Sequence, residues 1–478
     1  MWEKHTVEFL LYVTLAASLL APVTSPLGRR ENKAPVIMAG AGVGAFLAMA
    51  AVLLYATAGS TLSFYGGLVV QDSFTSMILL GAALAAAIYM VAVGAEGLSW
   101  SSSPSLYSLI PLTLFGSFFL AGAANLLVIL ASWLLVSVIS YVVVAAPDAK
   151  EAKGAAVRYI FVGVVATLAL IGSLAFYSIA TGTYSLQLSS LTQASPVARG
   201  IVALSVLLLL AALGFKVGLF PFHWWLPSVY GRGDGRTISF VASVIKLSFI
   251  AVLARVFVVS SFGSPLANDI ALTLAILSVA TMTYANVAAL TTRDLQVILA
   301  YSSMAQVGYI MAALAAAAYF AGRANYDMVR LALYAVAIQS IGYALAKAPL
   351  FAFTGAVGRE LDRLRGLMGA SPASAAAASV LLFSLLGVPP LLGFWGKFYL
   401  FLSTVGYTVW LALAALINSG VSAVYYVIAS RELLSKTPEP GLKAPLRSSI
   451  ALIVGSLLVL LLGLVAPIIY SSIVTIYV

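Results

Sequence analysis

The chain consists almost entirely of apolar runs of about 20 residues, and each run is long enough for a helix to cross roughly 30 Å of hydrocarbon. About fourteen such runs follow one another from end to end, separated by short polar or Gly/Pro-containing loops. Hydrophobic residues make up 62% of the chain and charged residues only 8%, far below the charged fraction of a soluble domain. The sequence therefore predicts an all-α polytopic membrane protein with about fourteen transmembrane helices.

The distribution of basic residues predicts the orientation of the chain. If the loops alternate sides, one side holds sixteen basic residues between Arg29 and Arg447, and the other holds only Lys4, Arg199, Arg323 and Arg330. By the positive-inside rule the first side is cytoplasmic, which places both termini on the outer side of a plasma membrane. The net charge of +10 is therefore a topology signal, and we expect no nucleic-acid partner.

Several kinds of chemistry are excluded by residue type. The chain has no cysteine and two histidines, so it cannot supply thiolates for an iron–sulfur cluster, two histidines for a haem, or a Cys/His zinc site. No glycine-rich phosphate loop or paired carboxylates in one loop are visible. We expect no cofactor and no metal, and redox chemistry would belong to a partner.

Four lysines lie inside apolar runs with no acidic residue near the middle of any run: Lys216, Lys246, Lys347 and Lys397. A charge in hydrocarbon costs at least about 2.5 kcal/mol. Low dielectric disfavours the charged form, so such a lysine can accept and release protons. A lysine can also snorkel to the interface or bond to the carbonyls of a neighbouring helix. Four independent cases of snorkelling are a weaker explanation than one proton path.

Two runs carry Gly and Pro in their interior, which predicts two discontinuous helices, near 214–227 and 385–398. Matched interruptions in two halves indicate an internal repeat with an ion path between its parts. We therefore expect a duplicated five-helix unit. The predicted units are residues 1–104 (three N-terminal helices), 105–260 (first repeat), 267–430 (second repeat) and 431–478 (a loop and the C-terminal helix).

Other polar residues are candidates for the proton path, and most of them also have a structural interpretation. His223 suits a proton shuttle by its ordinary titration range, or it is a hydrogen-bond donor beside a kink. Arg158 is either an anchor at the start of its span or a partner of Lys216. Tyr343 and Gln306 extend a polar relay or serve packing. Arg255, near the end of its span, and Asp72, at the mouth of the third, are expected to lie at the interface.

The chain resembles the antiporter-like, proton-translocating membrane subunits of NADH:quinone oxidoreductase (respiratory complex I), a family shared with Mrp-type cation/proton antiporters and membrane-bound hydrogenases. Five segments between residues 213 and 401 carry the resemblance: LGFKVGLFPFHWWLPSVY, SVIKLSFIAVLARVF, LQVILAYSSMAQVGYIM, YALAKAPLFAFTGAV and LLGVPPLLGFWGKFYLF. It implies fourteen helices, inverted five-helix repeats and a midplane chain of lysines. Lys216 would serve the first half channel, Lys246 the connection, Lys347 the central axis and Lys397 the second half channel.

One departure from the family concerns Lys216. The family places a glutamate in the fifth span, paired with this lysine, whereas NLLVILASWLLVSVISYV contains none and Ser132, Trp133 or Leu134 stands there. Another subunit supplies an acid, or Lys216 works unpaired, or the first half channel does not pump.

The leading functional hypothesis is a proton-translocating, non-redox subunit of a complex I-like or hydrogenase complex in a prokaryotic plasma (inner) membrane. Other membrane subunits and a peripheral redox module would be its partners. The alternatives are an Mrp-type cation/proton antiporter subunit, a stand-alone transporter of a small anion, and a structural spacer. No nucleophile with a base or catalytic carboxylate pair points to an enzyme in its own right.

Overall fold

The structure is a computed structural model that describes residues 2–23, 33–94, 100, 103–186, 195–437 and 442–473. Nearly all of this part is helical, because backbone N–H and C=O groups inside a bilayer must be paired within the protein. Twelve of the described helices are long and apolar enough to cross a membrane. The shorter helix α4 (Ser103–Gly122) and the broken pair α16 (Pro372–Leu386) and α17 (Leu392–Tyr407) add two further crossings. The prediction of a polytopic all-α protein with about fourteen spans is confirmed.

The N-terminal part contains three long helices and a small hairpin. Its elements are α1 (Trp2–Val23), α2 (Ala34–Ala56), β1 (Leu62–Phe64), the 3-10 turn η1 (Tyr65–Gly67), β2 (Val69–Gln71) and α3 (Ser73–Val93). Strand β1 pairs antiparallel with β2, with Ser63 opposite Val70. The sequence did not predict this hairpin, because three-residue strands are too short to show an alternating pattern.

The next group of helices contains the first break. Its elements are α4, α5 (Leu126–Ala145), α6 (Lys150–Thr181), α7 (Pro196–Val217), α8 (Trp225–Tyr230), α9 (Gly235–Phe240), the π-helical turn η4 (Val241–Ile245) and α10 (Lys246–Val259). Elements α9, η4 and α10 form one continuous span that is buried throughout.

The remaining helices contain the second break. They are α11 (Ala267–Ala289), α12 (Leu295–Ala321), α13 (Tyr326–Val357), the short α14 (Leu361–Leu364) and α15 (Leu367–Ala370), α16, α17, α18 (Val409–Leu433) and α19 (Leu446–Ile473).

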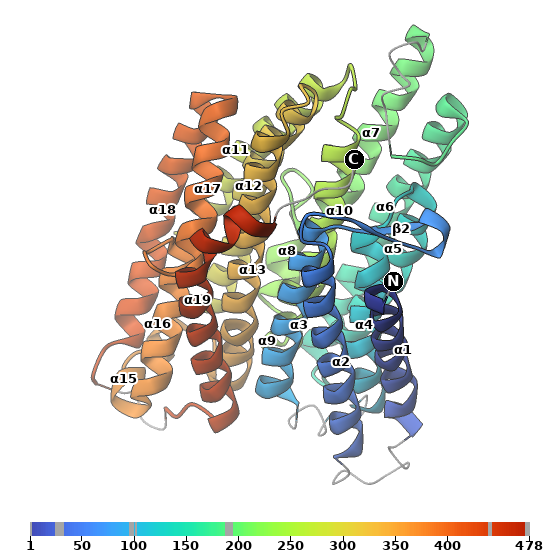
Figure 1. Cartoon of the computed structure of the whole chain (residues 1–478). Helices are drawn as coiled ribbons and strands as arrows, with labels where there is room; N and C mark the ends of the chain where they lie inside the picture. The colour runs from blue at the N-terminus through green and yellow to red at the C-terminus, as the bar shows by residue number, and fades with distance from the viewer. Residues whose placement is uncertain are drawn as a thin grey trace.

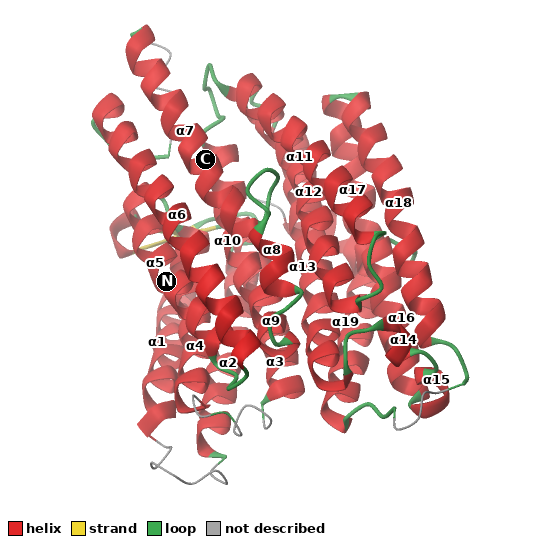
Figure 2. Cartoon of the chain, turned by 180° about the vertical axis from the view of Figure 1, so that it is seen from behind, coloured by secondary structure: helices red, strands yellow, loops and turns green. Residues whose placement is uncertain are grey.

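The helices stand side by side as an elongated bundle (Figures 1 and 2). Helices α5, α6 and α7 lie at one end of the bundle, α16 and α18 lie at the other, and α10, α12 and α13 lie between them. The central helices α12 and α13 are the most deeply buried long spans after α9–α10, each 89% buried over its apolar window. The core is therefore a row of helices enclosed on both sides, and it carries Lys246 on α10 and Lys347 on α13.

Both predicted breaks are present. Helix α7 ends at Val217, Gly218 takes a left-handed φ of +80°, and the chain resumes helix at Trp225. Helix α16 ends at Leu386, Gly387 takes a φ of +97°, and α17 begins at Leu392. Each helix ends at a glycine because a residue with a Cβ is disfavoured in this conformation.

Isolated β-bridges join chain segments where the helices begin and end. Val69 bridges to Ala123 and Asn125 bridges to Ser185. A third bridge joins Asp294 to Glu360. This pairing agrees with the alternation of loops between two sides that the charge analysis assumed.

Candidate functional site

All four predicted lysines are buried in the bundle. Their exposed fractions are 5% for Lys216, 2% for Lys246, 0% for Lys347 and 3% for Lys397, so none of them reaches the surface by snorkelling. No ion pair joins any of them to an acidic residue within the described ranges. Each ammonium group must therefore be stabilised by neutral polar groups, aromatic rings or water.

Lys397 is held by the second helix break. A helix end leaves its last carbonyls without intrahelical donors. The Lys397 Nζ donates to the carbonyl of Leu386, the last residue of α16, at 2.7 Å, and to the Ser419 hydroxyl of α18 at 2.8 Å. The Tyr309 ring lies 4.9 Å from the same nitrogen. The break thus supplies the oxygen that solvates this ammonium group.

Gln306 extends this arrangement toward Lys347. Its Nε2 donates to the carbonyl of Leu385 at 3.0 Å and to the Tyr426 hydroxyl at 3.3 Å. Lys347 donates to the Ser302 hydroxyl at 2.7 Å and to the Leu299 carbonyl at 2.8 Å. Ser302 in turn shares a short hydrogen bond with the Tyr426 hydroxyl. Hydrogen bonds therefore run from Lys347 through Ser302 and Tyr426 to Gln306, beside the broken end of α16.

A second group of polar side chains lies on the far side of Tyr309. The Asn286 Nδ2 donates to the Tyr309 hydroxyl at 3.2 Å and to Oδ1 of Asn418 at 3.2 Å. Tyr425 donates to Oδ1 of Asn286 at 2.9 Å. Asn418 immediately precedes Ser419, the hydroxyl bound by Lys397, so this group adjoins the lysine as well.

Lys216 has a different environment. Its Nζ donates one hydrogen bond, to the Tyr141 hydroxyl at 3.0 Å. Four aromatic rings surround the nitrogen at centroid distances of 4.7 to 5.5 Å; they belong to Tyr141, Phe249, Tyr159 and Trp133. A cation–π contact that is removed from water stabilises the cation by about 2 kcal/mol or more. We refer to these four residues as the aromatic cage.

The first helix break does not serve Lys216 as the second serves Lys397. The carbonyl of Phe215, near the end of α7, accepts a hydrogen bond from the Trp225 indole at 2.8 Å. A tryptophan of α8 thus takes a carbonyl at the first break, whereas a lysine and a glutamine take those at the second. The break beside Lys216 was expected to free carbonyls that solvate its ammonium group, and this expectation is wrong, because Lys216 donates to the Tyr141 hydroxyl. The arrangement is found instead at Lys397.

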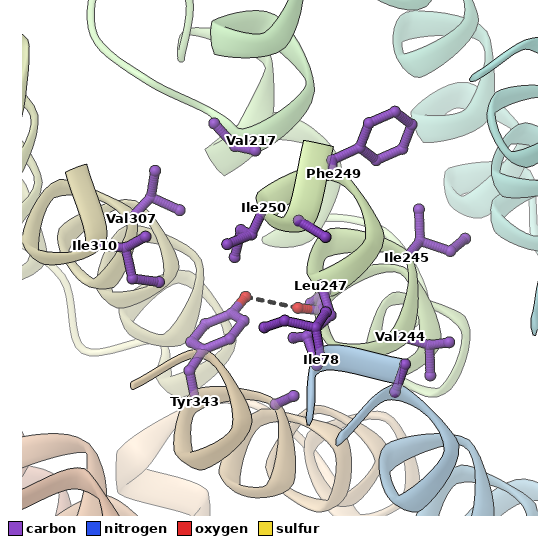
Figure 3. Packing of buried hydrophobic residues seen from close by; sticks show 14 of the residues in the cluster. Ile78, Val217, Val244, Ile245, Leu247, Phe249, Ile250, Val307, Ile310 and Tyr343 are labelled. Atoms are coloured by element: carbon purple, nitrogen blue, oxygen red, sulfur yellow. Dashed lines mark hydrogen bonds between the residues drawn. The ribbon is translucent and has the colours of Figure 1, made fainter. Parts of the chain in front are cut away.

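Lys246 follows the π-helical turn η4 directly. π-helical turns inside α-helices are rare and frequent at functional sites. Among the described residues the Lys246 Nζ has no hydrogen-bond partner, and it lies 5.2 Å from the Tyr230 ring and 5.7 Å from the Tyr343 ring. The Tyr343 hydroxyl donates to the Ala242 carbonyl within η4 at 2.6 Å, the dashed line that starts at Tyr343 in Figure 3. The same hydroxyl lies 3.1 Å from the Ser303 hydroxyl.

Comparison with known proteins identifies the family. The family model described as "NADH:quinone oxidoreductase/Mrp antiporter, TM" matches residues 123–422. The chain belongs to this family. NADH-quinone oxidoreductase subunit N of Dehalococcoides mccartyi is 29% identical to it over 95% of each chain.

Solved structures agree with the assignment. A chain of respiratory complex I from Thermus thermophilus superimposes with a TM-score of 0.78 at 28% identity, over 98% of both chains. A chain of the Mrp complex from Dietzia reaches a TM-score of 0.85 at 19% identity, over 98% of this chain and 96% of that one, which shows a shared fold. The antiporter-like chain is thus a multi-pass membrane protein of this family.

Two of the relay candidates lie among the lysines and two do not. Gln306 and Tyr343 belong to the contacts described above. His223 lies at the first break, with its ring 4.2 Å from the Tyr284 ring and 5.2 Å from the Phe220 ring. Arg158 is exposed on α6. No hydrogen bond joins His223 or Arg158 to a lysine in the part of the chain that the structure describes.

The expectation that Arg255 and Asp72 lie at the interface is wrong. Arg255 is 3% exposed, and its guanidinium pairs with the Asp72 carboxylate at 3.0 Å and donates to the carbonyls of Ala121 and Val70. Asp72 also caps α3, because its Oδ1 accepts from the Thr75 backbone at 2.8 Å. This ion pair joins the β1–β2 hairpin region to α10. Asp72 and Arg255 are 183 residues apart in the sequence.

Several polar residues near Lys347, Tyr309 and Lys397 were not predicted from the sequence. They are Ser302, Tyr426, Asn286, Asn418 and Ser419. Asparagine is costly in an apolar span unless it finds a partner there. Asn286 and Asn418 could have been recognised as site residues from the sequence, since each stands inside a predicted membrane span.

Proposed function

We propose that the chain carries protons across a prokaryotic plasma membrane as one subunit of a larger complex, with the buried lysines as the groups that bind and release them. The observation that carries the proposal is the set of four buried lysines, none of which has an acidic partner among the described residues. Two of them, Lys347 and Lys397, each donate to a serine hydroxyl. A fixed structural charge is usually paired, as Arg255 is with Asp72. Unpaired buried amines are suited to alternate between charged and neutral forms.

Proton movement in the second half would use the groups already in contact. Lys347 and Lys397 both bind hydroxyl groups, which can donate and accept a hydrogen bond at once. Gln306 and the Tyr426 hydroxyl lie between the two lysines. The Lys246 nitrogen has no hydrogen-bond acceptor among the described residues, and only aromatic rings are recorded near it, so we infer that hydration of this region accompanies its protonation.

The driving reaction would take place on partners. Two of the similar chains named above belong to NADH-quinone oxidoreductase or respiratory complex I, and the antiporter-like chain itself lacks cysteine ligands. We infer that a peripheral redox module and further membrane subunits assemble with it. Charge movement in this module would then bias the protonation of the lysines electrostatically.

The test is made on the complex purified in mild detergent through a tag on this chain. After reconstitution into liposomes, the complex should acidify or alkalinise the lumen when a reductant and a quinone are supplied, and Lys397→Ala should abolish this response while the quinone is still reduced. Arg330→Ala, on an exposed loop-proximal residue, is the matched control. Unchanged proton transport in Lys397→Ala would refute the proposal.

A second function is supported by the family description, which includes Mrp antiporters, and by the fold shared with the Mrp chain. An antiporter subunit would copurify without flavin or iron–sulfur proteins. Its liposomes would dissipate an imposed pH gradient on addition of Na⁺, without any reductant.

A further inference from the structure

The aromatic cage stands where the family's acidic partner of Lys216 is missing. Trp133, one of the three residues at the glutamate position, has its ring 5.5 Å from the Lys216 nitrogen. The other rings come from α5, α6 and α10, so the nitrogen is enclosed from several helices. Aromatic faces carry partial negative charge and attract an ammonium group, most strongly when both are removed from water.

The cage is held in place by contacts that do not involve the lysine. The Trp133 indole donates to the Thr167 hydroxyl at 3.1 Å, and its ring meets the Phe249 ring edge-on at 5.0 Å. Tyr159 is stacked on Trp225 at 5.0 Å with an interplanar angle of 18°. The rings therefore face the ammonium group without depending on it.

A glycine opposite Tyr141 makes room for the hydroxyl that Lys216 binds. A Cβ at Gly163 would lie 1.7 Å from the Tyr141 hydroxyl oxygen, which is a severe clash. Only glycine at this position allows the tyrosine to occupy its place between α6 and the lysine. Backbone, rings and hydroxyl thus form one built site for an ammonium group.

We propose that the aromatic cage, including Trp133, takes the place of a carboxylate beside Lys216 and favours its ammonium form over the neutral one. The role of Lys216 in proton transfer rests on the proposed function, but its charge state does not. The two ideas can therefore fail separately.

The test measures the charge state of the amine in the full-length chain in lipid nanodiscs. A membrane-permeant acylating reagent, acetic anhydride, reacts with neutral amines only, and the acylated fraction of each lysine is read by mass spectrometry after a short pulse at fixed pH. Trp133→Leu should raise acylation of Lys216 several-fold, because an important π face is gone. Acylation of Lys397 in the same molecules should not change.

Trp133→Glu separates charge stabilisation from packing. A carboxylate packs there no better than leucine, yet it should return acylation of Lys216 to the level of the unaltered chain or below it. Trp133→Phe should give an intermediate result, since it keeps a weaker ring. Trp395→Leu, which removes an aromatic residue on α17, is the matched control and should leave Lys216 unchanged.

Two results would overturn the proposal. Equal increases in Trp133→Leu and Trp133→Glu would mean that the tryptophan only blocks access of the reagent. No change in Trp133→Leu together with no change in Phe249→Leu would mean that the rings do not hold the charge. Phe249→Leu also serves if the Trp133 variants fail to fold. These outcomes are read from acylation of Lys216 and not from proton transport. A failure of the proposed function, which is tested by transport, is therefore distinguishable from a failure of this proposal.

Discussion

The two helix breaks present the same sequence elements, a lysine with Gly and Pro in an apolar span, but they build opposite environments. At the second break the lysine binds a freed carbonyl and a hydroxyl, and a glutamine binds the neighbouring carbonyl. At the first break a tryptophan takes the carbonyl, and the lysine is enclosed by four rings.

This difference shows that a buried lysine alone does not define a proton path. Hydroxyl and amide groups can reorient and pass hydrogen bonds along, whereas aromatic faces attract a cation without offering it an acceptor for its proton. We therefore propose that the second group of lysines, Lys347 and Lys397, exchanges protons. For Lys216 we propose that its surroundings favour a retained charge, since Tyr141 supplies its one hydrogen bond among the described residues.

The largest expected effect is on transport. Replacing Lys397 by Ala should abolish proton translocation by the purified complex, since it removes the amine at the centre of the exchanging half. Replacing Lys216 by Ala should reduce translocation less, because among the described residues this amine makes one hydrogen bond, to Tyr141, whereas Lys397 makes two. Proton flux per quinone reduced, measured with a pH-sensitive dye in liposomes, compares the two. An equal loss in both variants would remove the functional distinction between the halves.

The next effect concerns stability and contrasts a paired buried charge with the unpaired lysines. Asp72→Ala leaves the Arg255 guanidinium buried without its carboxylate, and removal of one partner of a buried pair costs about 3–5 kcal/mol. We expect a large drop in the thermal unfolding midpoint in detergent. Asp327→Ala, whose carboxylate is 94% exposed beside Arg330, should change it little. A small effect of Asp72→Ala would mean that Arg255 finds solvent or another partner.

A smaller effect tests the hydrogen bonds between Lys347 and Tyr426. Ser302→Ala removes the hydroxyl that contacts both residues and leaves buried polar groups unsatisfied, at a cost of about 1–3 kcal/mol. We expect lower stability and slower proton transport. Ser379→Ala is the matched control, because the buried Ser379 hydroxyl has no hydrogen-bond partner in the part of the chain that the structure describes, and its loss should be neutral. If both serine variants behave alike, Ser302 is not part of a path.

The sequence predicted the elements of the site better than their contacts. Apolar runs, glycines and prolines are local signals, so the spans, the two breaks and the depth of the four lysines followed from them. The partners did not follow, because they come from helices that are distant in the chain. Ser302 and Tyr426, for example, are 124 residues apart.

Two further differences have the same physical origin. Arg255 stands near the end of its span, where an arginine usually meets water, and only the folded hairpin region brings Asp72 against it. The aromatic cage consists of residue types that are common in membrane helices, so Trp133, Tyr141 and Tyr159 are not conspicuous in the sequence. Only the folded structure shows that these rings surround the Lys216 nitrogen.

The smallest effect decides whether Tyr343 relays protons or only supports η4. Its hydroxyl donates to the Ala242 carbonyl in this turn and contacts Ser303, while its ring faces Lys246. Tyr343→Phe keeps the ring and removes the hydrogen bonds, so we expect a loss of about 1 kcal/mol in the free energy of unfolding. If the hydroxyl belongs to the path between Lys246 and Lys347, proton transport should also slow, and by more than in a variant of equal stability such as Ser340→Ala on the same helix. Transport that follows stability alone would assign Tyr343 to holding the π-helical turn, and Lys246 would then depend on water for its connection to the second half.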